Sequence, residues 1–252
     1  MPTAVLGVIP ARYASTRFPG KSLAVIAGKP MIQHVYERAS RCTRFERLVI
    51  ATDDPRIAEA ALAFGAECQI TRDDHQSGSD RVAEVAAKFS NDIVVNIQGD
   101  EPLIDYNAIE AAIVALESAP ESQMATLAKI ITSPTELESS NVVKVVKDLS
   151  GNAIYFSRHA IPYQRGGPVA IFKHIGLYVY RRDFLLKYSL LPVGPLEKAE
   201  CLEQLRAIEN GHRIAVAETH YDSLGVDTPE DLEHIRQWVE AQVEERGEFA
   251  GK

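Results

Sequence analysis

The first half of the chain alternates between apolar runs and amphipathic segments, and this alternation restricts the folds that it can adopt. The runs predict strands at residues 4–10, 47–52, 66–71 and 92–98. Segments with helical spacing follow them, at residues 29–42, 53–67, 79–90 and 106–119. Such an alternation favours a mostly parallel sheet that is covered by helices on both faces. We therefore expect an α/β domain of the nucleotide-binding type.

Residues typical of helix ends mark several boundaries in this pattern. Asp54 and Pro55 are expected at the N-cap and the first position of one helix, and Gly65 is expected to end it. Thr228 and Pro229 mark the start of the closing helix in the same way.

The pattern changes from about Met124. Further strands are predicted at residues 124–132, 141–148, 152–158, 172–181 and 212–220. A helix is predicted over residues 194–211, between the last two of these strands. We expect a single domain over residues 1–252, with a strand-rich, partly antiparallel subdomain between about 125 and 190.

The net charge and the cysteine spacing restrict the binding partners and the cellular compartment that we expect. The formal net charge of −8 argues against nucleic acid or an anionic membrane as the main partner. Cys42, Cys68 and Cys201 show no metal-binding or redox spacing, which indicates buried free thiols in a reducing compartment. No apolar run approaches the roughly 20 residues of a membrane span. We expect a cytoplasmic protein.

The stretch ARYASTRFPGKSL, residues 11–23, has part of a P-loop pattern. Gly20, Lys21 and Ser22 match the second half of that pattern. Ser15 stands where the first glycine belongs, and Pro19 removes a backbone N–H from the loop. These departures leave three possibilities open, a damaged P-loop, a surface loop or a different way of holding phosphates.

The same stretch gathers cations where the first strand ends. Ligands of open α/β sheets bind beyond the carboxyl ends of the strands. Arg12, Ser15, Arg17 and Lys21 could there hold a triphosphate through side chains, since guanidinium and ammonium groups suit phosphate oxygens. The alternative, a solvated basic loop, stays open on residue types alone.

Two carboxylates follow other strands. Asp100 comes directly after the strand at residues 92–98, and Gly99 is expected to let the backbone turn close to a ligand. Asp227 precedes the closing helix, where Thr228 already supplies the cap. Two such carboxylates suit Mg²⁺ together with phosphate oxygens. The alternative is that these acids only form turns and caps, as Asp105 is expected to do.

The polar loop at residues 71–81 opens a helix and is a third candidate. Ser77, Gly78 and Ser79 could bring backbone groups close to a base or a ribose. The alternative is a capped helix start, with Ser77 or Ser79 as the cap.

These segments together resemble the 3-deoxy-manno-octulosonate (KDO) cytidylyltransferases, from about residue 4 to residue 234. The resemblance is carried by VIPARYASTRFPGKSLAVIAGKPMI, ATDD, HQSGSDR, VVNIQGDEPLI, NVVKVV, AIYFSRHAIPY, KHIGLYVYR, LEKAECLEQLR and GVDTPEDL. FSRHAIPY and LEQLR are specific to the KDO branch. Ser79 departs from the pattern, which has threonine there, but it keeps the hydroxyl.

The resemblance implies a nucleotide-diphospho-sugar transferase-like fold, with a Rossmann-like, mostly parallel sheet and a strand-rich dimerisation insertion. It implies that CTP and KDO react to CMP-KDO and pyrophosphate, with Mg²⁺ as cofactor, in lipopolysaccharide biosynthesis. It also implies a homodimer, with the sugar site and the dimer interface in the insertion.

The resemblance also implies roles for single residues. It assigns the CTP phosphates to Arg12, Ser15, Arg17 and Lys21, and the cytidine to Ser77, Gly78 and Ser79. It assigns Mg²⁺ to Asp100 and Asp227, which with Lys21 and Arg12 are the expected catalytic residues. It assigns the sugar to Gln98, Arg158, His174, Tyr178, Glu203 and Gln204, with Arg158 expected at the sugar carboxylate and the last two side by side on a helix.

Three alternatives remain beside this interpretation. The first is a cytidylyltransferase for another sugar acid, such as sialic acid or 8-amino-KDO. The second is a sugar-1-phosphate nucleotidyltransferase that uses another nucleotide. The third is a non-catalytic nucleotide-binding protein, since fold alone does not fix function.

Overall fold

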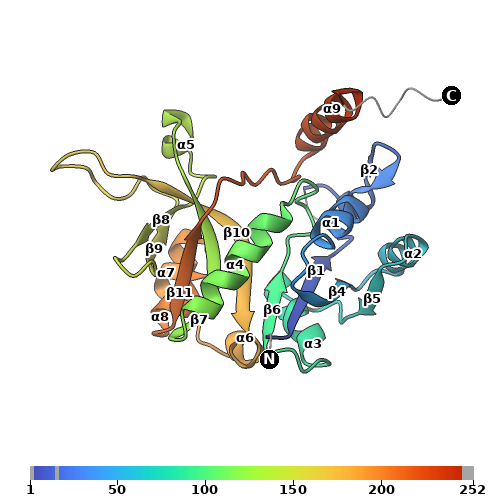
Figure 1. Cartoon of the computed structure of the whole chain (residues 1–252), viewed down its shortest axis with the longest axis horizontal. Helices are drawn as coiled ribbons and strands as arrows, with labels where there is room; N and C mark the ends of the chain where they lie inside the picture. Colours follow the sequence, from blue (N-terminus) through green and yellow to red (C-terminus); the bar gives the residue numbers. More distant parts are fainter. Residues whose placement is uncertain (1–2, 15–16, 246–252) are drawn as a thin grey trace.

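The computed structural model describes residues 3–14 and 17–245, which form a central sheet flanked by helices (Figure 1). The main path of the sheet has the order β11-β7-β10-β6-β1-β4-β5, and β8 and β9 pair beside β10. The bounds of the strands are β1 Val5–Ala11, β4 Phe45–Thr52, β5 Glu67–Ile70, β6 Ile93–Asn96, β7 Ser122–Ile130, β8 Lys144–Lys147, β9 Ala153–Ser157, β10 Phe172–Arg181 and β11 Arg213–Glu218. Two short strands, β2 Val25–Ile26 and β3 Lys29–Pro30, form a separate hairpin.

The pairing directions confirm the predicted mostly parallel sheet. β1 runs parallel to both β4 and β6, β4 runs parallel to β5, and β11 runs parallel to β7. β10 is antiparallel to β6, β7 and β8, so the antiparallel part predicted for the second half enters the central sheet itself. The subdomain limits near residues 125 and 190 stay a prediction.

Two apolar cores lie on opposite faces of the sheet. Along β1, Val5 and Ile9 pack into one core and Leu6 and Val8 into the other, because successive side chains of a strand point to opposite faces. The first core contains side chains of α1 Met31–Ala39, α2 Pro55–Ala63 and α4 Tyr106–Ser118. The second contains side chains of α3 Gly78–Ala86, α6 Arg182–Tyr188 and α8 Leu205–Glu209. The remaining helices are α5 Pro134–Glu138, α7 Pro195–Glu200, α9 Pro229–Glu245 and the 3₁₀ turn Lys21–Leu23.

The predicted helix boundaries are confirmed where a cap was expected. Asp54 accepts a hydrogen bond from the Arg56 N–H at 2.9 Å, and Pro55 is the first residue of α2. Gly65 follows α2 with a φ of 81°, a left-handed conformation that favours glycine. Thr228 accepts from the Asp231 N–H at 3.2 Å at the start of α9.

The single helix predicted over residues 194–211 is wrong, because the segment breaks into α7 and α8. Cys201 takes a left-handed conformation with a φ of 52° and is exposed, contrary to the expected buried thiol. An ion pair of 2.6 Å between Glu197 and Arg206 spans the break. In a continuous helix these residues would lie about 13 Å apart along the axis and on opposite sides. The break therefore permits the ion pair.

Lys144 is fully buried and binds main-chain carbonyls of the segment that leads into β8. Its ammonium donates to the carbonyl oxygens of Ser139 at 2.8 Å, Val142 at 2.7 Å and Arg158 at 2.6 Å. These three bonds use every donor of the group and compensate its loss of water. Lys144 thereby joins the segment before β8 to the residue that follows β9.

We expect Lys144→Met to lower the free energy of unfolding by about 3 kcal/mol, because three buried carbonyls lose their donor. Urea unfolding of the variant and of Lys88→Met, which changes an exposed lysine, provides the comparison. A loss no larger than that of the control would show that the three carbonyls find other partners.

Candidate functional site

A cavity of about 310 Å³ lies at the carboxyl ends of the parallel strands, and we call it the strand-end cavity. Its walls come from the chain that follows β1, from the start of α3 and from the chain that follows β6. They are lined by Pro10, Ala11, Arg12, Arg17, Lys21, Ser22, His75, Ser77, Gly78, Arg81, Gln98, Gly99, Asp100 and Asp227. Segments far apart in the sequence therefore meet at the edge where ligands of such sheets bind.

Asp100 and Asp227 converge in this cavity on the ammonium group of Lys21. Lys21 Nζ lies 2.6 Å from Asp100 Oδ2 and 3.1 Å from Asp227 Oδ1, and it donates to the Val226 carbonyl at 2.9 Å. Arg17 pairs with the other oxygen of Asp227 at 2.9 Å. Sequence reasoning named both carboxylates but left their convergence open.

A buried carboxyl group, which sequence reasoning missed, holds this arrangement together. Glu101 accepts hydrogen bonds from Ser223 at 2.6 Å and Tyr221 at 3.0 Å. Burial, with the neighbouring Asp100 carboxylate, raises the pKa of Glu101 to about 7 against the effect of the two hydroxyl donors. The Val226 N–H also donates to the Asp100 carbonyl at 2.9 Å. The chain before Asp227 is thus fixed to the chain after β6.

Gly99 lines the strand-end cavity and also makes a close approach to the end of β1. A Cβ at this position would lie 2.5 Å from the carbonyl oxygen of Pro10 at the end of β1. Only glycine leaves room for that oxygen. Gly99 therefore sets the spacing between the two strand ends that carry the cationic loop and Asp100.

The described part of the cationic loop turns back at Gly20 toward Tyr13. Gly20 has a φ of 72°, and its N–H donates to the Tyr13 carbonyl at 2.9 Å. The guanidinium of Arg56 lies 3.3 Å from the centre of the Tyr13 ring. Arg12 is exposed and lines the cavity. Ser15, which the resemblance assigns to the phosphates, lies outside the described residues.

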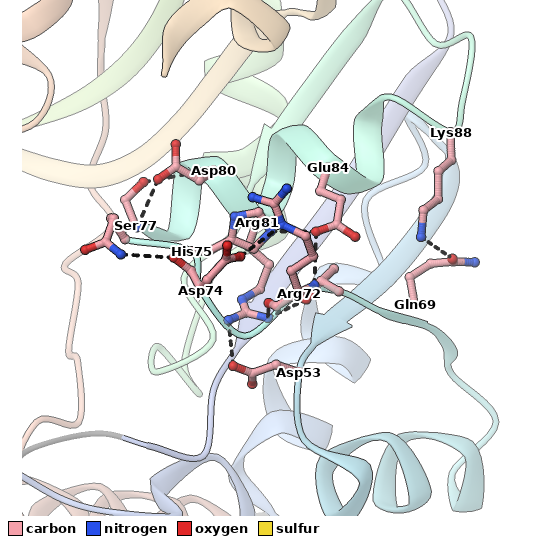
Figure 2. A network of polar contacts seen from close by, with 12 residues as sticks. Asp53, Gln69, Arg72, Asp74, His75, Ser77, Asp80, Arg81, Glu84 and Lys88 are labelled. Carbon is pink, nitrogen blue, oxygen red and sulfur yellow. Dashed lines mark hydrogen bonds and ion pairs between the residues drawn. The ribbon is translucent and has the colours of Figure 1, made fainter. Parts of the chain in front are cut away.

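Arg81 of α3 clamps the loop between β5 and α3 (Figure 2). Its guanidinium donates to the Thr71 hydroxyl, to the Arg72 carbonyl at 3.3 Å and to Asp53 Oδ2 at 3.0 Å. Arg81 is 4% exposed and lines the strand-end cavity. One side chain therefore joins the ends of β4 and β5 to α3.

Glu84, one helical turn further along α3, holds the same loop (Figure 2). Its Oε2 atom accepts from the Arg72 N–H at 3.1 Å and pairs with His75 Nε2 at 2.6 Å. These hydrogen bonds hold the pKa of Glu84 below its usual value although burial raises it. Glu84 therefore fixes the loop at Arg72 and at His75, of which His75 lines the strand-end cavity.

The serines that follow this loop take different roles. Ser77 is the N-cap of α3, and its hydroxyl accepts from the Asp80 N–H at 3.1 Å, so this alternative was correct. Ser77 and Gly78 also line the strand-end cavity, as the cytidine assignment requires. Ser79 does not line it but faces a neighbouring cavity.

That neighbouring cavity, of about 140 Å³, is called the tyrosine cavity below. It is lined by Gly78, Ser79, Asn96, Gln98, Tyr178, Tyr180, Tyr188, Glu203 and Gln204. Glu203 and Gln204 do not lie on one helix as expected, because they occupy the break before α8. Burial raises the pKa of Glu203, against the effects of Ser79 and Arg206. Four of the predicted sugar-site residues, Gln98, Tyr178, Glu203 and Gln204, therefore meet here.

The two other predicted sugar-site residues lie elsewhere. His174 lines a third cavity of about 340 Å³, which shares Tyr178 and Gln204 with the tyrosine cavity. Arg158 lines neither cavity. Its guanidinium donates to the main-chain carbonyls of Glu200 at 2.8 Å and of Ser140 at 3.0 Å. Sequence reasoning placed these two residues beside the sugar without any signal for their different surroundings.

His174 and Tyr178 are both neutral at neutral pH. Burial lowers the pKa of His174 to about 3 and raises the pKa of Tyr178 well above its usual value. His174 Nε2 lies 2.9 Å from the Thr126 hydroxyl, and its ring meets Phe156 edge-on. These two residues can therefore offer hydrogen bonds to a ligand but no charge.

The carboxylate pair fits a hard divalent cation. Two carboxylate oxygens from different segments already meet around one cationic group, the ammonium of Lys21. One or two protein carboxylates plus phosphate oxygens are the ligand set that Mg²⁺ prefers. Within residues 3–14 and 17–245, no group of three or more His, Cys, Asp or Glu side chains forms a fuller metal site.

A mostly parallel sheet with a cationic loop and a carboxylate pair at its strand ends defines a protein of the nucleotidyltransferase class. Among the described residues, no helix is both long enough and apolar enough to cross a membrane.

Comparisons with known proteins give the particular family. The family model described as cytidylyltransferase matches residues 6–214. The chain is 60% identical to the 3-deoxy-manno-octulosonate cytidylyltransferase of Solibacter usitatus (strain Ellin6076), over 96% of the chain and 97% of that protein. It is 52% identical to the protein of the same name from Pelobacter propionicus, over 92% of the chain and 96% of that protein. The chain therefore belongs to the 3-deoxy-manno-octulosonate cytidylyltransferase family, and the resemblance seen in the sequence is confirmed.

Solved structures agree with this result. A structure of CMP:2-keto-3-deoxy-manno-octonic acid synthetase complexed with CTP has a TM-score of 0.91 and 45% sequence identity, over 95% of this chain and all of that one. A 4-diphosphocytidyl-2C-methyl-D-erythritol synthase from Anaerococcus prevotii has a TM-score of 0.64 at 10% identity, over 95% of this chain and all of that one. The second likeness concerns the fold alone, and the predicted fold class is confirmed.

The buried His174 predicts a pH dependence of stability. Its folded pKa of about 3 lies below the unfolded value, so its contribution is complete above about pH 6.5 and falls as the unfolded chain takes up a proton at lower pH. We expect the wild type to lose about 2 kcal/mol more than His174→Gln between about pH 7.5 and pH 5. Urea unfolding at the two pH values measures this difference, and equal losses would contradict it.

Proposed function

We propose that this chain transfers CMP from CTP to KDO, giving CMP-KDO and pyrophosphate for lipopolysaccharide biosynthesis. The observation that carries the proposal is the convergence of Lys21, Asp100 and Asp227 between a cationic loop and the tyrosine cavity. Membership of the family supports the choice of both substrates.

The strand-end cavity has the charges that a triphosphate needs. Arg12, Arg17 and Lys21 line it and can neutralise phosphate oxygens. Ser77 and Gly78, which follow the clamped loop, line the same cavity, so the cytidine is proposed to bind beside them. Ser15 keeps its predicted phosphate role.

The reaction joins the 2-hydroxyl oxygen of KDO to the α-phosphorus of CTP and breaks the bond to pyrophosphate. Catalysis of such transfers is mostly positioning and charge stabilisation. Lys21 and Arg12 can offset the charge that grows on the leaving pyrophosphate. Asp100 and Asp227 would hold Mg²⁺, which supplies Lewis-acid activation and charge neutralisation when bound.

KDO is itself a carboxylate and needs a cation away from the triphosphate. Arg158 is proposed for this role, because its Nε and Nη groups spend three N–H donors on main-chain carbonyls and a guanidinium has five. The carbonyls hold the guanidinium in place, and two donors remain for the carboxylate. The roles of Gln98, His174, Tyr178, Glu203 and Gln204 at the sugar hydroxyls stay proposals of the same kind.

A second copy of this chain is the proposed partner. Several large apolar side chains are exposed on β9 and on the connection between β9 and β10, which extends away from the body of the protein (Figure 1). They include Ile154 at 55%, Tyr163 at 90% and Val169 at 55% exposure. A group of exposed apolar side chains of this kind favours an interface between two copies of this chain.

The experiment that tests the function is pyrophosphate release from CTP with Mg²⁺ and KDO, against mixtures that lack one component each. Release that depends on all three establishes the activity. Parallel reactions with sialic acid, 8-amino-KDO and UTP separate the alternatives. Binding of CTP without release from any sugar acid would contradict the proposal and favour a non-catalytic nucleotide-binding protein.

We expect Asp100→Asn to lower kcat by at least roughly 100- to 1,000-fold while the thermal midpoint stays within a few degrees, because the change removes charge at the reacting phosphate. Asp105→Asn is the matched control. Asp105 caps α4 through the Asn107 N–H at 2.9 Å, and asparagine caps equally well. Near-normal turnover of Asp100→Asn would remove the proposed metal role.

A further inference from the structure

The tyrosine cavity contains two buried acceptor oxygens that lack a partner. Asn96 Oδ1 and Glu203 Oε1 receive no hydrogen bond from any described residue. Asn96 is only 2% exposed. A buried acceptor without a donor costs about 1–3 kcal/mol, so two of them in one cavity indicate that a ligand supplies the donors.

The position of Asn96 aims its side chain into this cavity. Asn96 is the last residue of β6 and lies directly opposite Tyr178 of β10. Residues opposite each other in an antiparallel pair have their side chains on the same face, as does Tyr180 two residues further along β10. These three side chains all line the tyrosine cavity.

Two of the three tyrosine hydroxyls around the cavity donate to other groups, and the third, that of Tyr180, contacts the side chains of Ser79 and Asn96. Tyr188 donates to the Glu203 carbonyl at 2.6 Å, and Tyr178 donates to Gln204 Oε1 at 3.2 Å. Neither can also satisfy Asn96 Oδ1 or Glu203 Oε1, since a phenol has one proton. An occupant with at least two O–H groups therefore fits the cavity.

The proposed reacting groups do not line this cavity. It shares Gly78 and Gln98 with the strand-end cavity, but Lys21, Asp100 and Asp227 do not line it. A substrate whose 2-hydroxyl lies at the carboxylate pair would therefore reach the tyrosine cavity with its opposite end. In KDO that end carries the C7–C8 diol.

We propose that the tyrosine cavity receives the hydroxylated tail of the sugar acid, and that Asn96, beside Glu203, accepts a hydrogen bond from it and selects for it. This inference rests on the proposed function and adds Asn96 as a residue that determines the acceptor. An acceptor without the tail hydroxyls would leave these buried oxygens unpaired and would therefore bind more weakly.

The test compares wild type and Asn96→Leu, each with KDO and with a KDO analogue that lacks the C8 hydroxyl. We expect the Asn96→Leu substitution alone, or removal of the C8 hydroxyl alone, to raise KM for the sugar acid about tenfold or more. KM for CTP should stay within twofold. The two losses should not add, because both remove the same hydrogen bond. Asn107→Leu, on the exposed first turn of α4, is the control and should leave both constants unchanged.

Two outcomes overturn the inference. Additive losses would make Asn96 a structural residue only. Unchanged KM values would mean that the cavity holds water only. If Asn96→Leu fails to fold, the analogue with wild type still decides, because an unchanged KM overturns the inference. Absence of wild-type turnover contradicts the proposed function and not this inference. In that case the affinities of KDO and of its analogue, measured by calorimetry in the presence of a non-hydrolysable CTP analogue, test the cavity.

A second inference comes from the ammonium of Lys21, which occupies the position between the two carboxylates. Its side chain is 13% exposed, and it contacts Asp100 Oδ2 at 2.6 Å and Asp227 Oδ1 at 3.1 Å. A divalent cation would need these same two oxygens. Two cations within contact distance of the same oxygens repel each other, so the metal and Lys21 compete for them.

We infer that Lys21 takes the place of the metal until the nucleotide arrives. Triphosphate oxygens then offer Lys21 and Arg17 an alternative anion, and the carboxylates become available to the cation that accompanies CTP. By linkage, the nucleotide and the metal must each increase the affinity of the other by the same factor.

Binding of Mn²⁺, measured by electron paramagnetic resonance without any sugar, tests this second inference. We expect Lys21→Met to bind Mn²⁺ at least about tenfold more tightly than wild type in the absence of nucleotide. A non-hydrolysable CTP analogue should tighten binding to wild type more than binding to the variant. Lys29→Met, which removes an ion pair with Glu37, is the control and should behave as wild type.

Two outcomes overturn this inference. If wild type and Lys21→Met bind Mn²⁺ equally tightly without nucleotide, the lysine does not compete with the metal for the carboxylates. Equally weak binding by both would mean that the carboxylates hold no metal alone. Because no sugar acid is present, either result is independent of which acceptor the enzyme uses.

Discussion

The contact of Lys21 with Asp100 and Asp227 is the constraint on which the geometry of the site depends. It joins three segments that are far apart in the sequence, and each segment is fixed separately. The packing of Gly99 against Pro10 sets one spacing, and the buried carboxyl of Glu101 sets another. The ion contact thus forms between parts that the fold has already positioned.

Much of this arrangement follows from local sequence rules. The alternation of apolar runs and amphipathic segments predicted the parallel sheet, because each segment must bury one face. The N-caps at Asp54 and Thr228 were predictable because capping depends on residues a few positions apart. Asp100 and Asp227 could be proposed because both lie where strands or loops reach the same sheet edge.

Other features depend on contacts between distant residues and were not predictable. Residues 194–211 have helical spacing in the sequence, but contacts with other parts of the chain hold the break at Cys201. The Glu197–Arg206 ion pair spans it, and the Tyr188 hydroxyl donates to the Glu203 carbonyl. Asp100 and Glu101 are neighbouring acids that look alike in a sequence. They differ in burial, because Asp100 lines the strand-end cavity whereas Glu101 is enclosed and hydrogen-bonded by Tyr221 and Ser223.

The clamp on the loop between β5 and α3 has a consequence for the thermodynamics of recognition. Arg81 and Glu84 fix this loop through contacts within the chain. Ordering a mobile side chain on binding costs about 0.5–1.5 kcal/mol, and a loop that is ordered beforehand avoids that cost. The proposed contact of the cytidine base with this loop would therefore avoid that cost, so more of its free energy would appear as affinity.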